Sequence, residues 1–184
     1  EMSSSLVGSE MCIRDTPLSQ LATHAANASL MDAKVEPTDV DHLVWGNVLP
    51  VDPDGFYTGR VAALNVGMPE ESCALQVNRA CGSGTQAIIT AAQQIMTGHS
   101  KIALAGGGEN FSRGGFVNQK MRWGAIRGAQ PFEDAVEWAY NDPFGHGLMG
   151  VTGENLADDF QYLREDMDKW GEMSQQRAGV AMKS

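Results

Sequence analysis

The sequence of 184 residues is short of cysteine and contains no long apolar run, and each shortage excludes a class of protein. Cysteine occurs three times, as Cys12, Cys73 and Cys81, with neither CxxC nor metal-ligand spacing. We therefore expect no disulfide framework, no bound metal and a reducing, cytoplasmic compartment. No run reaches the roughly 18 apolar residues that a membrane-spanning helix needs, so we expect no membrane segment.

Positive charge is also scarce, because 13 Lys and Arg face 23 Asp and Glu, for a formal net charge of −10. Nucleic acids and anionic membrane surfaces bind basic patches, so the composition argues against both as partners. An anionic substrate would need a local cluster of basic residues. The sequence contains one such cluster, but a basic stretch of solvated loop explains it equally well. Its members lie close together in sequence: Arg113, Lys120, Arg122 and Arg127.

The apolar pattern predicts alternating helices and strands over residues 16–110. The expected helices cover residues 17–33, 58–66 and 83–97, and the expected strands cover 42–48, 73–78 and 102–105. This alternation is typical of an α/β fold with a mostly parallel sheet and crossover helices. The uncharged stretch 80–100 predicts a helix buried between protein layers.

Residues 111–184 form a second, less regular part of the chain. Residues 111–150 are rich in glycine and show little periodicity, and helices are expected at about 152–160 and from residue 164 onward. Residues 1–15 resemble a translated sequencing adapter, so we treat them as non-native and give Cys12 no role. Because the sequence ends within a helical pattern without a cap, we expect a C-terminally truncated fragment.

The main candidate for chemistry is Cys81, which lies where the strand 73–78 meets the helix 83–97. The free backbone N–H groups and the positive dipole end of a helix N-terminus favour thiolate over thiol. A thiolate attacks carbonyl carbon, so the position predicts a nucleophile for acyl transfer. A buried, inert cysteine remains an alternative for Cys81, and it is the favoured interpretation of Cys73.

Another interpretation of the same junction is a dinucleotide-binding domain. Gly82-x-Gly84-x-x-Ala87 follows a strand, and Glu109 lies 22 residues beyond Ala87, near where a ribose-binding acid belongs. One observation argues against this interpretation, because Glu109 follows three glycines rather than the end of a strand. A simpler role for Glu109 is to hold a loop in place. His146, in a glycine-rich loop, is a candidate for contact with substrate.

Several motifs, in order along the chain, resemble those of the thiolases. The run 78–88 is similar to the family's nucleophile motif, and supporting matches occur at 46–48, 59–63, 105–113, 122–124, 142–144 and 149–157. The similarity is greatest to bacterial acetyl-CoA acetyltransferases of the broad-specificity β-ketothiolase type. It implies a layered α/β/α fold for residues 16–110, and for residues 111–184 part of the loop domain that covers coenzyme A.

The resemblance also implies a function in fatty acid metabolism. Thiolases form or cleave 3-ketoacyl-CoA from acyl-CoA and acetyl-CoA, and they use these coenzyme A thioesters as substrates without another cofactor. By resemblance, Cys81 carries the acyl group, its N–H is one donor to the thioester oxyanion, and Met149 lines the acyl pocket. A homo-oligomer of the full-length parent is expected.

The sequence departs from the family pattern near Met149, because Leu148 stands where a histidine is usual and His146 lies two residues earlier. The family's activating histidine and second cysteine belong to a C-terminal half, so this chain alone is expected to be acylated slowly at most. A β-ketoacyl synthase-like condensing enzyme and a non-catalytic thiolase-like subunit stay open as alternatives.

Overall fold

Three parallel strands form the centre of the first of two units in the computed structural model, which describes residues 15–183. The strands are β1 (His42–Gly46), β2 (Cys73–Val77) and β3 (Ala103–Gly107), in the order β2-β1-β3. In this register His42 lies opposite Cys73 on one side and Ala103 on the other. The predicted parallel sheet is confirmed. The adapter-like segment 1–15, with Cys12, falls almost wholly outside the described residues.

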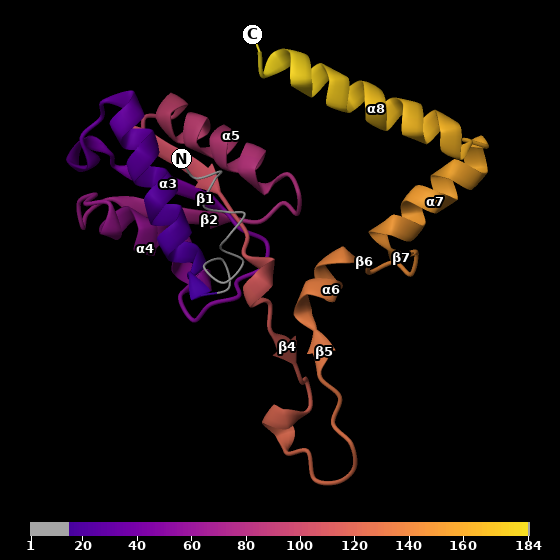
Figure 1. Ribbon diagram of the computed structural model, residues 1–184. Coiled ribbons are helices and arrows are strands. Elements are labelled where there is room, and N and C mark those ends of the chain that lie inside the picture. Colours follow the sequence, from indigo (N-terminus) through magenta and orange to yellow (C-terminus); the bar gives the residue numbers. More distant parts are fainter. Residues whose placement is uncertain (1–14, 184) are drawn as a thin grey trace. The chain divides into compact units, whose positions relative to one another are not determined.

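Helices cover both faces of this sheet (Figure 1). The helices α3 (Leu18–Ala33) and α4 (Thr58–Asn65) pack on one face with Leu43 and Trp45 of β1. The helix α5 (Ser83–Met96) packs on the other face, where Val44 contacts Ala87 and Ala91. Because successive side chains of a strand point to opposite faces, the apolar run 43–45 supplies both halves of the core. The result is a three-layered α/β/α unit.

In the described chain, the expected burial of the uncharged helix between protein layers is found on one side of α5 alone. Only Ser83, Ala87 and Ala91 of this helix are buried, whereas Ile88 is 63% and Met96 84% exposed. One stripe of a helix is enough to cover a sheet, and no other described element of the first unit covers the rest of α5. The expected stop of this helix is confirmed, because Gly98 has a φ of 75° just after its end.

Short elements complete the first unit. The 3₁₀ turns η1 (Pro37–Asp39) and η2 (Gly55–Tyr57) lie in the connections before β1 and before α4. After β3, the chain forms the 3₁₀ turns η3 and η4, the antiparallel pair β4–β5 and the short helix α6. The two turns are η3 (Phe111–Arg113) and η4 (Met121–Trp123). The paired strands are β4 (Phe116–Val117) and β5 (Glu133–Asp134), and the helix is α6 (Ala135–Tyr140).

The second unit begins at Tyr140, within α6. It contains the short pair β6 (Asn141–Asp142) and β7 (Gly147–Leu148), followed by α7 (Met149–Phe160) and α8 (Arg164–Ala181). Both helices were expected, although α7 begins three residues before the expected start at residue 152. The division of the chain at residue 110 into core and loop domain stays a prediction.

Candidate active site

Cys81 lies in the turn that joins β2 to α5, beyond the carboxyl ends of the strands. The neighbouring strands β1 and β2 lead to α4 and α5, which lie on opposite faces of the sheet. In open α/β sheets, ligands bind outside the carboxyl ends of strands at such a switch point. Cys81 is an exposed free thiol, so an incoming group has access to it.

The backbone just before Cys81 is held in an unusual conformation. Ala80 has a φ of 46°, in the left-handed region that costs an ordinary residue about 1 kcal/mol. The side chain of Asn78 supports this conformation, because its Oδ1 accepts a hydrogen bond from the Ala80 N–H at 3.0 Å. Its Nδ2 donates to the carbonyl oxygen of Val48 at 3.2 Å, which ties the turn to the loop after β1.

Ser83 closes the same turn from the helix side. Its Oγ accepts a hydrogen bond from the Arg79 N–H at 2.8 Å and donates one to the Ala80 carbonyl oxygen at 2.7 Å. The backbone N–H of Ser83 donates to that same carbonyl oxygen at 3.0 Å. With a side chain that is nearly buried, Ser83 thus fixes the backbone on both sides of Ala80.

Three amide groups remain open at this turn. The N–H groups of Cys81, Gly84 and Thr85 donate no hydrogen bond to any residue within 15–183. The first N–H groups of a helix have no intrahelical partner, and they attract negative charge. The thiol of Cys81 therefore lies beside backbone donors that can stabilise an oxyanion.

The two other predicted site residues lie in the second unit. His146 is in the loop between β6 and β7, where its N–H donates to Asp142 Oδ2 at 3.0 Å and its Nε2 lies 4.0 Å from the same oxygen. Met149 is the first residue of α7, and its side chain is exposed. The loop thus brings His146 and Met149 into one short segment, whereas Cys81 belongs to the first unit.

Glu109 ties down a loop, as expected. Its carboxylate accepts hydrogen bonds from Asn47 Nδ2 at 2.9 Å, from the Leu49 N–H at 3.1 Å and from the Val48 N–H. In the dinucleotide-binding unit, the strand with the ribose acid neighbours the strand before the glycine loop, but here β1 separates β2 from β3. The nucleotide-binding alternative therefore has no free acid in the required place.

Two other residues from the sequence analysis have different surroundings from those expected. Cys73 is exposed rather than packed in the core, because it starts β2 at the edge of the described sheet. Arg113 is engaged by Asp52, with its Nε 2.6 Å from Asp52 Oδ1, so it anchors η3 to the loop after β1. The remaining basic residues, Lys120, Arg122 and Arg127, are exposed between β4 and β5.

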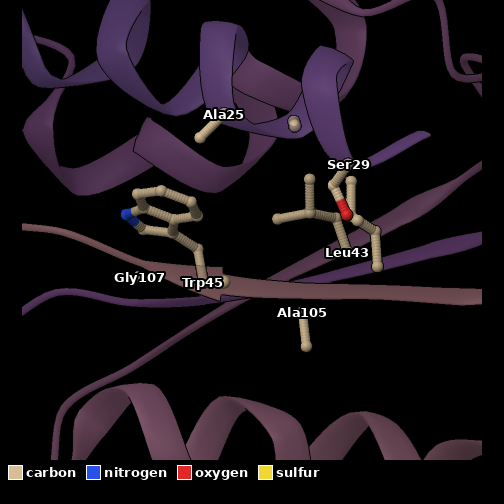
Figure 2. A pocket seen from close by; sticks show the side chains of 9 residues that line it. Ala25, Ser29, Leu43, Trp45, Ala105 and Gly107 are labelled. Atoms are coloured by element: carbon tan, nitrogen blue, oxygen red, sulfur yellow. The ribbon is translucent and has the colours of Figure 1, made fainter. Parts of the chain in front are cut away.

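A cavity of about 120 Å³ lies between α3 and the sheet, away from Cys81. Figure 2 shows Leu43 and Trp45 pointing into it, while Ala105 points to the opposite face. Its lining contains no charged side chain, and the one hydroxyl in it, that of Ser29, has no acid or base among the other lining residues to activate it. Within residues 15–183 no group of three His, Cys, Asp or Glu is arranged to hold a metal. In the same part of the chain, every helix is too short or too polar to cross a membrane.

Comparison with known proteins identifies the family. The family description "Thiolase, N-terminal domain" matches residues 3–184, so the chain belongs to the thiolase family. It is 40% identical to the β-ketothiolase BktB of Cupriavidus necator over 94% of this chain and 44% of that protein. It is 36% identical to human mitochondrial 3-ketoacyl-CoA thiolase over 90% of this chain and 42% of that protein.

Solved structures agree with the family and the fold. Human mitochondrial 3-ketoacyl-CoA thiolase in complex with CoA matches with a TM-score of 0.86 and 35% identity, over 93% of this chain and 44% of that chain. The Bacillus anthracis acetyl-CoA acetyltransferase matches with a TM-score of 0.80 and 32% identity, over 91% and 42%. The chain thus spans less than half the length of the relatives it matches.

The sequence analysis missed the residues that shape the turn around Cys81. Asn78 and Ser83 were considered only as parts of a motif, yet their side chains make the hydrogen bonds that hold Ala80. One local signal was available, because Asn and Ser favour turns in which the side chain bonds to nearby backbone. That signal gives no indication of a left-handed alanine.

Proposed function

We propose that this chain is the N-terminal part of a thiolase that transfers acyl groups between coenzyme A thioesters, with Cys81 as the acyl carrier. The observation that carries the proposal is the exposed thiol of Cys81 beside open amide groups at the start of α5. Membership of the thiolase family supports the same chemistry.

In the proposed first half-reaction, the sulfur of Cys81 attacks the thioester carbonyl of an acyl-CoA. The carbonyl oxygen becomes an oxyanion, and the Cys81 N–H stabilises it by about 3 kcal/mol, the usual value of one such donor. When the intermediate collapses, its bond to the coenzyme A sulfur breaks, coenzyme A leaves as a thiolate, and the acyl group stays on Cys81.

In the second half-reaction, the acyl group passes to the α carbon of acetyl-CoA, which has lost a proton, and 3-ketoacyl-CoA is released. The reverse sequence, with coenzyme A as the attacking thiol, is thiolysis. Both directions need a general base and a proton donor. By resemblance, these are a histidine and a cysteine in the C-terminal half of the protein.

Further parts of the proposal concern substrate contacts. His146 and Met149 would contribute to the acyl pocket, supported by their exposure and by their closeness in sequence, on either side of β7. Lys120, Arg122 and Arg127 would attract coenzyme A phosphates, supported by the exposed positive charge that they place in one connection. Coenzyme A thioesters would be the substrates, with no additional cofactor.

The cellular setting is proposed more broadly. The free thiols of Cys73 and Cys81 support a reducing cytoplasmic location, and the relatives' activity supports a role in fatty acid metabolism. We propose self-association of the complete enzyme, which is supported by its resemblance to the usually oligomeric thiolases. The net charge supports partners other than nucleic acid.

Substituting Cys81→Ser in the complete enzyme tests the proposal. We expect thiolysis of acetoacetyl-CoA to fall by at least about a thousandfold, because a hydroxyl is a far weaker nucleophile than a thiolate at neutral pH. Cys73→Ser is the matched control, since it removes the other exposed thiol of the described chain. Wild-type thiolysis by Cys81→Ser would refute the role of Cys81.

A second experiment uses the 184-residue chain itself. After incubation with acetyl-CoA, peptide mass spectrometry should find a slow gain of one acetyl group on Cys81 and none on Cys73. Equal acetylation of both cysteines would show that exposure alone determines the reaction.

A further inference from the structure

The peptide group between Ala80 and Cys81 connects the two features of the turn. Its carbonyl oxygen belongs to Ala80 and its N–H belongs to Cys81. In a trans peptide these two groups point in opposite directions. Whatever fixes the Ala80 carbonyl therefore also fixes the direction of the Cys81 N–H.

Ser83 fixes that carbonyl with two hydrogen bonds. The Ser83 Oγ donates at 2.7 Å and the Ser83 N–H at 3.0 Å, both to the Ala80 carbonyl oxygen. The hydroxyl itself is anchored, because it accepts from the Arg79 N–H at 2.8 Å. With the carbonyl held on the side of α5, the Cys81 N–H points away from the helix, and no acceptor for it lies within residues 15–183.

The two hydrogen bonds also change the electron distribution of the peptide. A carbonyl oxygen that accepts hydrogen bonds polarises its peptide group, and the N–H of the same group becomes a stronger donor. The Ser83 hydroxyl is therefore placed to aim the Cys81 N–H and to strengthen it.

We propose that Ser83 is a positioning residue for acyl transfer, because its hydroxyl orients and polarises the peptide that supplies the Cys81 N–H to the thioester oxyanion. The inference rests on the proposed role of Cys81. Ser83 touches neither substrate nor the reacting atoms. Its effect reaches them through one peptide group.

Two reactions of the Cys81 thiol separate this role from a general loss of structure. Acyl transfer forms an oxyanion, whereas alkylation by iodoacetamide is a direct displacement that forms none. In the complete enzyme, Ser83→Ala should lower kcat for thiolysis about tenfold, less than the loss of a whole oxyanion donor, and leave KM nearly unchanged. The alkylation rate of Cys81 should stay within about twofold, because the thiol itself is retained.

Matched variants isolate the hydroxyl. Thr and Val have the same shape, and only Thr keeps the hydroxyl, so Ser83→Thr should retain several times the kcat of Ser83→Val. This pair decides the question if Ser83→Ala does not fold. Equal kcat for Thr and Val, an unchanged kcat in Ser83→Ala, or a parallel loss of alkylation and thiolysis would each overturn the proposal.

The Cys81→Ser variant tests the proposed function, and the Ser83→Ala variant tests the positioning role. If Cys81→Ser retains thiolysis, the proposed function fails whatever Ser83 does. If Cys81→Ser is inactive and Ser83→Ala is fully active, the function stands and only the positioning role falls.

Discussion

Gly46, the last residue of β1, lies directly against Ser83, the first residue of α5. A β carbon added to Gly46 would lie 2.7 Å from both the carbonyl carbon and the carbonyl oxygen of Ser83. These are backbone atoms, which a side-chain rotation cannot move away. The absence of a side chain at Gly46 is therefore what allows the start of α5, and the turn with Cys81, to approach the sheet.

We expect Gly46→Ala to destabilise the chain by about 2 kcal/mol, because the start of α5 must shift to relieve the contact. Urea unfolding followed by circular dichroism measures the change. The control is Gly84→Ala, where an added β carbon meets nothing within 4 Å. Since Gly84 lies in α5, alanine should leave stability unchanged or raise it by up to about 1 kcal/mol. Equal destabilisation by the two variants would contradict the close approach.

Glu109 should contribute to stability through the loop after β1. Its carboxylate accepts three hydrogen bonds, from the side chain of Asn47 and from the backbone of Val48 and Leu49. Glu109→Gln removes the charge and one acceptor oxygen, so we expect a loss of about 2 kcal/mol in the free energy of unfolding. Glu71→Gln, at an exposed position, should change it by less than about 0.5 kcal/mol.

Titration with NAD gives an independent test of the same residue. Because the Glu109 carboxylate is already hydrogen-bonded, we expect no saturable binding of NAD to the chain. Saturable binding that Glu109→Gln weakens would restore the dinucleotide-binding interpretation.

The order of the elements was predictable because it depends on local patterns. Apolar periodicity predicted α3, α4, α5 and the three strands to within about three residues, and Gly98 correctly marked the end of α5. The start of α7 was missed by three residues, because Gly150 resembles a loop position although it lies in the helix.

The surroundings of individual residues were less predictable, because they depend on tertiary contacts. Cys73 has the neighbours of a core residue in sequence, yet it is exposed because β2 lies at the edge of the described sheet. Ala80 is left-handed only because Asn78 and Ser83 hold it there. An alanine in the sequence carries no indication of that conformation.

Asp41 should make the stability of the first unit depend on pH. The hydrogen bond from the Ser100 hydroxyl is the main cause that lowers the pKa of the Asp41 carboxyl, and the Lys101 N–H adds a hydrogen bond at 2.8 Å. A lowered pKa in the folded state means that the ionised form is favoured by folding. Its contribution is complete above the unfolded pKa of about 4 and is lost as the pH falls through the lower, folded value.

We therefore expect Asp41→Asn to cost about 1 kcal/mol at pH 7 and to reduce the loss of stability on acidification below about pH 4. Denaturant unfolding measures both effects, at pH values from about 2.5 to about 7 that span the protonation of the Asp41 carboxyl. Asp39→Asn is the control, because Asp39 is exposed. Asp41 precedes β1, at the amino ends of the strands, so the rate of Cys81 alkylation should be the same in all three proteins. An unaltered pH profile in Asp41→Asn would contradict the assignment.

The uncovered stripe of α5 should dominate the behaviour of the 184-residue chain in solution. Ile88 is 63% and Met96 84% exposed on this helix, and Ile95 adds to the same apolar surface. Exposed apolar patches bind hydrophobic dyes and promote association. We expect the chain to bind anilinonaphthalene sulfonate, to self-associate at micromolar concentration and to unfold over a broad temperature range.

Substituting Ile88→Gln should weaken dye binding and self-association without lowering the unfolding temperature, because the side chain is already mostly in water and loses little packing. Met31→Gln is the matched control, since Met31 is 78% exposed on α3, at the other face of the sheet, and should change association little. Analytical ultracentrifugation and a thermal melt measure both properties. A monomeric chain with a sharp, cooperative melt would show that the α5 surface needs no cover.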